Sequence, residues 1–256
     1  MHELTYDELR VTILDDNDAA GEKAAEAFAQ AASAELATKE RIAVILATGN
    51  SQLSFVRALS RRDDIEWNRI IVLHMDEYLG MSEDHPASFR LWMKKNVVDA
   101  LHPLRFEGVR GDHVPVDEEL TRYDALLRDL KPSICVMGIG ENGHLAFNDP
   151  PADFETHDLV RIVQMDEVSR RQQVGEGHFP SLAETPTHAI SLTIPALLSP
   201  AHVLVVAPER RKAAAVRAAL EDEITPLCPA SILRRNGHAR LFLDADSAGE
   251  LAVAAR

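Results

Sequence analysis

The chain has 256 residues, of which 46% are hydrophobic and 27% are charged, a composition typical of a globular protein with a full core. Its net charge of −14 argues against general nucleic-acid binding, although local cations could still hold a small phosphorylated ligand. No apolar run reaches the length of a membrane span, the N-terminus has no signal-peptide pattern, and Cys135 and Cys228 form no CxxC pair. We therefore expect a cytoplasmic protein without membrane partners, disulfides or zinc.

Apolar runs alternate with helical patterns from end to end, which predicts a parallel sheet with helices on both faces. The expected strands are 11–14, 42–46, 69–74, 134–137, 159–164, 189–193, 203–207 and 240–243. The expected helices are 17–39, 51–61, 86–101, 117–130, 166–173, 194–198, 210–220 and 230–234. No repeat, low-complexity stretch or linker divides the chain, so we predict one doubly wound, mostly parallel, Rossmann-like α/β domain over residues 1–256.

Ligands of such folds bind where several strands end, and four strand-end loops here should converge in space. The loop after 134–137 contains two glycines and then Asn142, His144 and Asp149. His144 can transfer a proton near neutral pH, and Asp149 could orient and charge-stabilise it. A simple turn is the alternative. No helix follows the Gly138-x-Gly140-x-x-Gly143 pattern directly, which excludes a dinucleotide fingerprint.

The loop after 42–46 contains Gly49, Asn50 and Ser51 at the start of a predicted helix. Backbone N–H groups and the helix dipole can bind an anion there. The loop lacks the GKS/T sequence of a nucleotide-triphosphate site. The alternative is that Ser51 or Asn50 only caps the helix.

The loop after 69–74 places Asp76 and Glu77 directly behind a buried strand. Since side chains alternate along an extended chain, one of the two should point inward, and Asp76 is the candidate general base. A solvated turn is the alternative. His74 and His85 lie nearby, but the spacing fits no known metal-ligand pattern, and we predict no metal.

The loop after 203–207 leads to Lys212 in the first turn of an Ala-rich helix. A cation opposes the helix dipole at that position, so a bound anion would explain the lysine. A solvated lysine is the alternative.

Together these loops resemble the glucosamine-6-phosphate deaminase (isomerase) family, which is related to the 6-phosphogluconolactonases. The resemblance covers nearly the whole chain in order. The matching segments are Thr48-Gly49-Asn50-Ser51, Met75-Asp76-Glu77-Tyr78, His85-Pro86-Ala87-Ser88-Phe89, Gly138 to His144 with Phe147-Asn148-Asp149-Pro150, Arg211-Lys212-Ala213, and Pro229-Ala230-Ser231-Ile232-Leu233.

The resemblance implies conversion of an amino-sugar 6-phosphate to a ketose 6-phosphate with release of ammonia, without cofactor or metal. His144 would open the sugar ring, with Asn142 and Asp149 holding its tautomer and orientation. Asp76 would move the C2 proton to C1. The phosphate would be bound by Gly49, Asn50, Ser51 and Lys212. The implied partner is a small sugar phosphate, and a homo-oligomer is compatible with the sequence.

The chain departs from the family pattern at several positions. Asp149 is one methylene shorter than the family's common Glu, so its contact with His144 is expected to shift or to run through water. In Ser169–Gly175 only the first of two family arginines, Arg170, is kept. Pro151 and Ala152 stand near the paired serines that some members use for allosteric activation, so such regulation is expected to be absent.

Two alternatives to the deaminase remain open. One is a phosphosugar lactonase, although lactonases usually lack the His85–Phe89 element and this histidine loop. The other is a non-catalytic sugar-phosphate-binding module, which usually carries a DNA-binding helix-turn-helix. The net charge of −14 and the start of the chain at the first strand disfavour that module.

Overall fold

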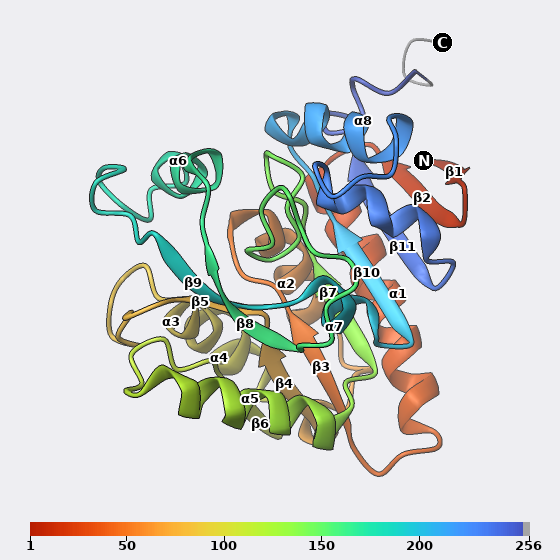
Figure 1. Cartoon of the computed structure of the whole chain (residues 1–256). Helices are drawn as coiled ribbons and strands as arrows, with labels where there is room; N and C mark the ends of the chain where they lie inside the picture. Colours follow the sequence, from red (N-terminus) through yellow and green to blue (C-terminus); the bar gives the residue numbers. More distant parts are fainter. Residues whose placement is uncertain (253–256) are drawn as a thin grey trace.

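The computed structural model describes residues 1–252 and has an eight-stranded main sheet in the order β1-β2-β11-β10-β7-β3-β4-β6 (Figure 1). Only β1 is antiparallel to its neighbour, as the pairing of the other strands is parallel throughout. The strands are β1 His2–Tyr6, β2 Leu9–Leu14, β3 Ile42–Leu46, β4 Ile70–His74, β6 Arg105–Glu107, β7 Ile134–Met137, β10 His202–Val206 and β11 Ala239–Asp244. The predicted α/β class is confirmed.

Helices cover both faces of this sheet. The α-helices are α1 Asn17–Leu36, α2 Leu53–Ser60, α3 Phe89–Met93, α4 Asp99–Leu101, α5 Val116–Leu130, α6 Glu167–Gly175, α7 Ile194–Leu198 and α8 Ala213–Glu221. Short 3-10 helices are η1 Asn50–Gln52, η2 Trp67–Arg69, η4 Arg210–Lys212 and η5 Pro229–Arg235, and η3 Lys94–Val98 is a π-helix. None of the described helices is long and apolar enough to cross a membrane.

The two faces of the main sheet form two separate hydrophobic cores. In β3, Ile45 packs into the core that α5, α7 and α8 cover, whereas Val44 packs into the core under α1 and α2. All residues of β3, β4 and β7 are buried. Burial on both faces explains why these strands read as continuous apolar runs rather than as alternating patterns.

A second, three-stranded antiparallel sheet is the main difference from the sequence-based expectation. It consists of β5 Asp76–Tyr78, β9 His188–Leu192 and β8 Val160–Gln164. The expectation that 159–164 and 189–193 belong to the parallel sheet is wrong. Both segments instead pair with each other and with β5, which follows β4 after one residue. Helix α6 lies between β8 and β9 in sequence and stands apart from the main sheet (Figure 1).

Smaller differences have local causes. The helix expected over 86–101 begins only at Phe89, because Ser88 caps it by accepting a hydrogen bond from the Leu91 N–H (3.3 Å), and it continues as η3 and α4. The sequence analysis predicts neither β1 nor β6. Strand β6 is too short to show a pattern in the sequence, and β1 is largely exposed.

Candidate active site

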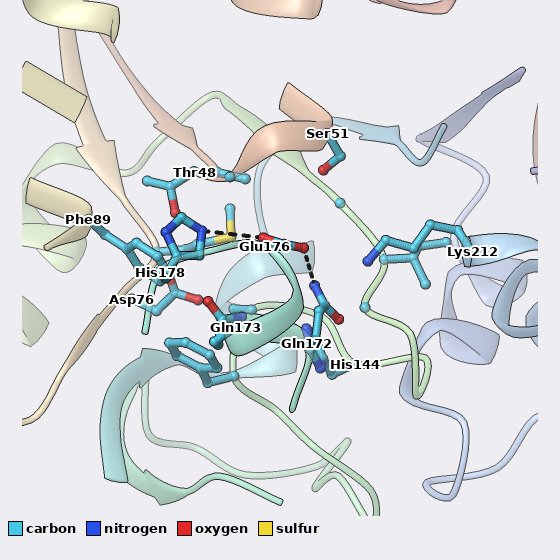
Figure 2. A pocket seen from close by; sticks show the side chains of 18 residues that line it. Thr48, Ser51, Asp76, Phe89, His144, Gln172, Gln173, Glu176, His178 and Lys212 are labelled. Carbon is cyan, nitrogen blue, oxygen red and sulfur yellow. Dashed lines mark hydrogen bonds and ion pairs between the residues drawn. The ribbon is translucent and has the colours of Figure 1, made fainter. Parts of the chain in front are cut away.

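One pocket gathers the ends of four neighbouring strands, β10, β7, β3 and β4 (Figures 1 and 2). The convergence of these strand-end loops, expected from the sequence, is confirmed. The lining residues are Ala47, Thr48, Gly49, Ser51, Met75, Asp76, Phe89, Gly138, Ile139, Gly140, His144, Ala146, Phe147, Gln172, Gln173, Glu176, His178 and Lys212. The switch point of the sheet lies between β3 and β7, because the chain runs outward from β3 through β4 to β6 and, on the other side, from β7 through β10 to β11. Doubly wound sheets bind ligands at such a point.

The ring of His144 lies directly on the backbone of Gly140. A Cβ atom added to Gly140 would lie 2.2 Å from Nε2 of His144, so no other residue fits at position 140 without displacing the ring. Nδ1 of His144 contacts Oδ1 of Asp149 at 3.0 Å. Nε2 has no protein partner among the described residues, and His144 lines the pocket. One ring nitrogen is therefore held while the other is free to exchange a proton.

Asp149 is held in turn by two further groups. It accepts hydrogen bonds from Nδ2 of Asn142 (2.9 Å) and from the backbone N–H of Asp166 (2.8 Å). Burial raises the pKa of Asp149, but these hydrogen bonds and the contact with His144 outweigh burial and lower it. Oδ1 of Asn142 accepts the backbone N–H of His144 (3.0 Å). Asn142 and Asp149 thus lie behind His144 and position it, without lining the pocket themselves.

The direct contact also corrects one expectation. The shorter side chain of Asp149 reaches His144 without an intervening water, because the loop from Leu145 to Asn148 folds back on itself. The Asn148 N–H donates to the Leu145 carbonyl (3.1 Å), and the amide of Asn148 donates to the same carbonyl (2.8 Å).

Asp76 and Glu77 point to different places. Asp76 lines the pocket, is buried, and has no hydrogen-bond partner for its carboxylate among residues 1–252. Burial, and secondarily the charge of Glu77, raise its pKa well above the usual aspartate value. Glu77 instead accepts hydrogen bonds from the Ser88 hydroxyl (2.8 Å) and from the N–H groups of Phe89 (3.2 Å) and Arg90 (2.9 Å). Glu77 therefore holds the start of α3, and only Asp76 is available to a ligand.

The glycine loop after β3 uses no side chain to cap the helices that follow it, and Oγ of Ser51 accepts a hydrogen bond from Nε2 of Gln52 (3.2 Å). Gly49 has φ +102°, a conformation that favours glycine. Neither Asn50 nor Ser51 makes a side-chain capping bond to η1 or α2, so the capping alternative finds no support in the geometry. Ser51 lines the pocket, whereas Asn50 is exposed and outside the lining. The side chain of Asn50 is therefore not placed to bind a ligand in this pocket.

Lys212 ends η4 immediately before α8 and is 2% exposed. It lines the pocket, and Figure 2 shows its side chain reaching toward Glu176 and Ser51 without an ion pair. Burial, and secondarily the charge of Arg211, lower the pKa of Lys212 to about 8. A buried ammonium without a partner in the described chain contradicts the solvated-lysine reading and favours a bound anion.

Four residues around the end of α6 also line the pocket, and the sequence interpretation missed them: Gln172, Gln173, Glu176 and His178. Arg170, the kept arginine of the family pattern, does not reach the pocket and instead donates to the Thr185 carbonyl (2.9 Å). One sequence feature could have identified these residues. It is the polar run Glu176-Gly177-His178, in which Glu176 has a glycine on each side, directly after the segment compared with the family.

Within residues 1–252, no group of three or more His, Cys, Asp or Glu side chains is arranged so that it could hold a metal ion. Nε2 of His74, which lies close to Asp76 in the sequence, accepts the backbone N–H of Val109 (2.8 Å) instead. Burial lowers the pKa of His74 to about 3, so it is a neutral core residue.

Comparison with known proteins places this site in a family context. The family model described as glucosamine-6-phosphate isomerases/6-phosphogluconolactonase matches residues 15–243 of this chain. A glucosamine-6-phosphate deaminase of Exiguobacterium sibiricum is 35% identical over 85% of this chain and 84% of its own. One of Bacillus pumilus is 29% identical over 93% of this chain and 98% of its own.

Solved structures agree with the sequence comparison. One described as a monomeric glucosamine-6-phosphate deaminase superposes with a TM-score of 0.84 at 27% identity, over 93% of this chain and 98% of its own. A 6-phosphogluconolactonase of Thermotoga maritima shares the fold, with a TM-score of 0.73 at 20% identity over 91% of this chain and 98% of its own. The chain belongs to the glucosamine-6-phosphate isomerase/6-phosphogluconolactonase family.

Proposed function

We propose that the protein converts glucosamine 6-phosphate to fructose 6-phosphate and ammonia. The observation that carries the proposal is one pocket with an unpartnered buried carboxylate, Asp76, an oriented histidine, His144, and an unpartnered buried ammonium, Lys212. The relatives at 35% and 30% identity are named glucosamine-6-phosphate deaminase. An ester hydrolysis would leave the base at Asp76 without a C–H proton to move.

The phosphate would bind at Lys212, Ser51 and the backbone of Gly49. Binding there supplies energy at a distance from the reacting carbons and places C1 and C2 near the catalytic groups. Of Gly49, Asn50 and Ser51, Asn50 would contribute through its backbone alone.

The chemistry would begin with ring opening. His144 takes the proton of the anomeric hydroxyl and returns it to the ring oxygen, and its contact with Asp149 stabilises the protonated ring in between. Asp76 then takes the proton from C2 of the open aldose and delivers it to C1, while the C2 ammonium gives up one proton and the C1 oxygen takes one up. This produces an iminium at C2 and a hydroxymethyl group at C1, and water hydrolyses the iminium to the ketone with release of ammonia.

The direct test incubates the purified full chain with glucosamine 6-phosphate and measures ammonia and fructose 6-phosphate separately. We expect the two products in equal amounts. A parallel incubation with 6-phosphogluconolactone tests the lactonase alternative, since acid release there without ammonia release from the amino sugar would contradict the proposal.

We further propose that the whole chain acts as one catalytic domain, since the family model spans 229 of its positions, residues 15–243. One solved relative is described as monomeric, which supports a site that one copy of the chain completes. Cys135 and Cys228 are both free thiols, which supports a reducing, cytoplasmic compartment.

A further inference from the structure

A carboxylate lies in the part of the pocket where we place the phosphate. Glu176 lines the pocket together with Gly49, Ser51 and Lys212. Its side chain is 8% exposed, and its Oε2 lies 4.0 Å from the position that a Cβ atom on Gly49 would occupy. A phosphate dianion on the Gly49 loop would therefore meet a buried negative charge at close range.

Glu176 is held by three side chains. Its Oε1 accepts a hydrogen bond from NH1 of Arg211 (2.5 Å). Figure 2 shows the other two contacts: Oε1 also accepts from Nε2 of Gln172 (2.9 Å), and Oε2 lies 3.3 Å from Nε2 of His178. Burial raises the pKa of Glu176, but these contacts outweigh it and lower the pKa to about 2. The carboxylate is therefore charged at any working pH and cannot avoid the phosphate by taking up a proton.

Arg211 is next to Lys212 and is shared by three carboxylates. Its NH1 also contacts Glu141 (3.1 Å), and its Nε contacts Glu209 (2.6 Å). Two cations thus face three carboxylates at this end of the site. If Glu176 left Arg211, the guanidinium would keep Glu141 on NH1 and Glu209 on Nε, and NH1 would lose one of its two carboxylate contacts. Lys212 and Arg211 together would then match the two charges of a phosphate.

The backbone around Glu176 permits such a movement. Gly175 and Gly177 flank it, and an added Cβ atom would meet nothing within 4 Å at either glycine. Gly177 has φ +82°, a conformation that few other residues adopt readily. Glu176 thus lies between two exposed glycines, while its own N–H remains bonded to the Gln172 carbonyl (2.9 Å), so the movement required is one of the side chain.

We propose that Glu176 is a built-in competitor for the phosphate site: an entering phosphate takes its place on Arg211, which then becomes the second phosphate-binding cation beside Lys212. The proposal rests on the proposed phosphate site and deepens it. An anion can bind Arg211 only if its interaction with the guanidinium is stronger than that of Glu176. The exchange therefore selects dianionic phosphates over monoanions such as carboxylates, which interact more weakly.

Titration of the full chain with inorganic phosphate, followed by calorimetry, tests this. Glu176→Gln should bind phosphate about tenfold more tightly than the wild type, which corresponds to roughly 1.4 kcal/mol. Arg211→Met should bind it more weakly, and adding Glu176→Gln to Arg211→Met should restore less than the tenfold gain. Glu167→Gln removes the same charge from the exposed side of α6 and should leave the affinity unchanged.

Equal or weaker phosphate binding by a folded Glu176→Gln variant would overturn the proposal. If that variant does not fold, a crystal structure of the wild type with phosphate decides, since Glu176 still in contact with Arg211 would also overturn it. The phosphate titration measures binding and does not depend on catalysis. If the wild type releases ammonia from glucosamine 6-phosphate but Glu176→Gln binds phosphate no more tightly than the wild type, only this inference fails and the proposed function stands.

Discussion

The imidazole of His144 and the carboxylate of Asp149 are in direct contact, with Nδ1 and Oδ1 3.0 Å apart. The same carboxylate accepts two more hydrogen bonds, from Asn142 and from the Asp166 backbone. Asp149 is therefore held in place by groups other than His144. This arrangement supports our proposal that His144 transfers the proton and that Asn142 and Asp149 position it.

His144→Gln should therefore damage turnover of the closed sugar far more than turnover of an open-chain analogue. Ring opening precedes the C2-to-C1 proton transfer, so an open substrate bypasses the step that His144 serves. We expect a loss of about 10²-fold or more in kcat on the closed form. Steady-state kinetics on both substrates check this, and equal losses on the two would move His144 to the later proton transfer.

Asp149→Ala should lower kcat by about 10- to 100-fold, because a histidine without its anchor samples unproductive orientations. The phosphate end of the site is untouched, so inorganic phosphate should compete as well as before. A parallel loss of phosphate affinity would show that the variant disturbs the whole pocket.

Gly140→Ala should abolish activity for a geometric reason, since its Cβ atom would lie 2.2 Å from Nε2 of His144. The ring must move, and the proton-transfer geometry is lost with it. Gly237→Ala is the matched control, because its Cβ atom would make only an ordinary contact at 3.4 Å, with Glu8. Activity assays beside thermal unfolding separate this effect from loss of the fold. Full activity in Gly140→Ala would remove His144 from the mechanism.

Lys212→Met should raise KM for the sugar phosphate by at least tenfold with little change in kcat, since it removes binding energy remote from the reacting carbons. The exposed Lys95→Met is the charge-matched control and should behave as wild type. Because the pKa of Lys212 is lowered to about 8, the ammonium loses its proton as pH rises through that value. KM of the wild type should therefore increase above about pH 8, and a KM that stays flat up to pH 9.5 would contradict this role.

Much of the candidate site could be predicted because each proposed functional group stands in a loop that follows a buried strand. Asp76, His144 and Lys212 stand behind continuous apolar runs, and parallel strands bring such positions to one edge of the sheet. The alternation of side chains along an extended chain also predicted that only one of Asp76 and Glu77 points inward, and the family resemblance indicated Asp76.

The rest depends on contacts that local patterns do not contain. Strand β5 has three residues and pairs with β9 more than a hundred positions later, so neither periodicity nor turn residues indicate the second sheet. That sheet carries α6 and with it Glu176 and His178 to the pocket. The partners of Arg211 likewise come from three separate segments, which only the folded chain brings together.

The most direct test of the account compares ammonia release from glucosamine 6-phosphate by the wild type and by Asp76→Asn. Asparagine keeps the shape of the buried side chain but cannot accept the C2 proton. We expect ammonia and fructose 6-phosphate in equal amounts from the wild type. If Asp76 moves the C2 proton, kcat of the variant should be lower by roughly 10²–10⁴-fold at similar KM. Because burial raises the pKa of Asp76, wild-type activity should also fall on the acidic side at a pH above the usual aspartate range. No ammonia from the wild type, or more than about a tenth of its kcat in Asp76→Asn, would contradict the account.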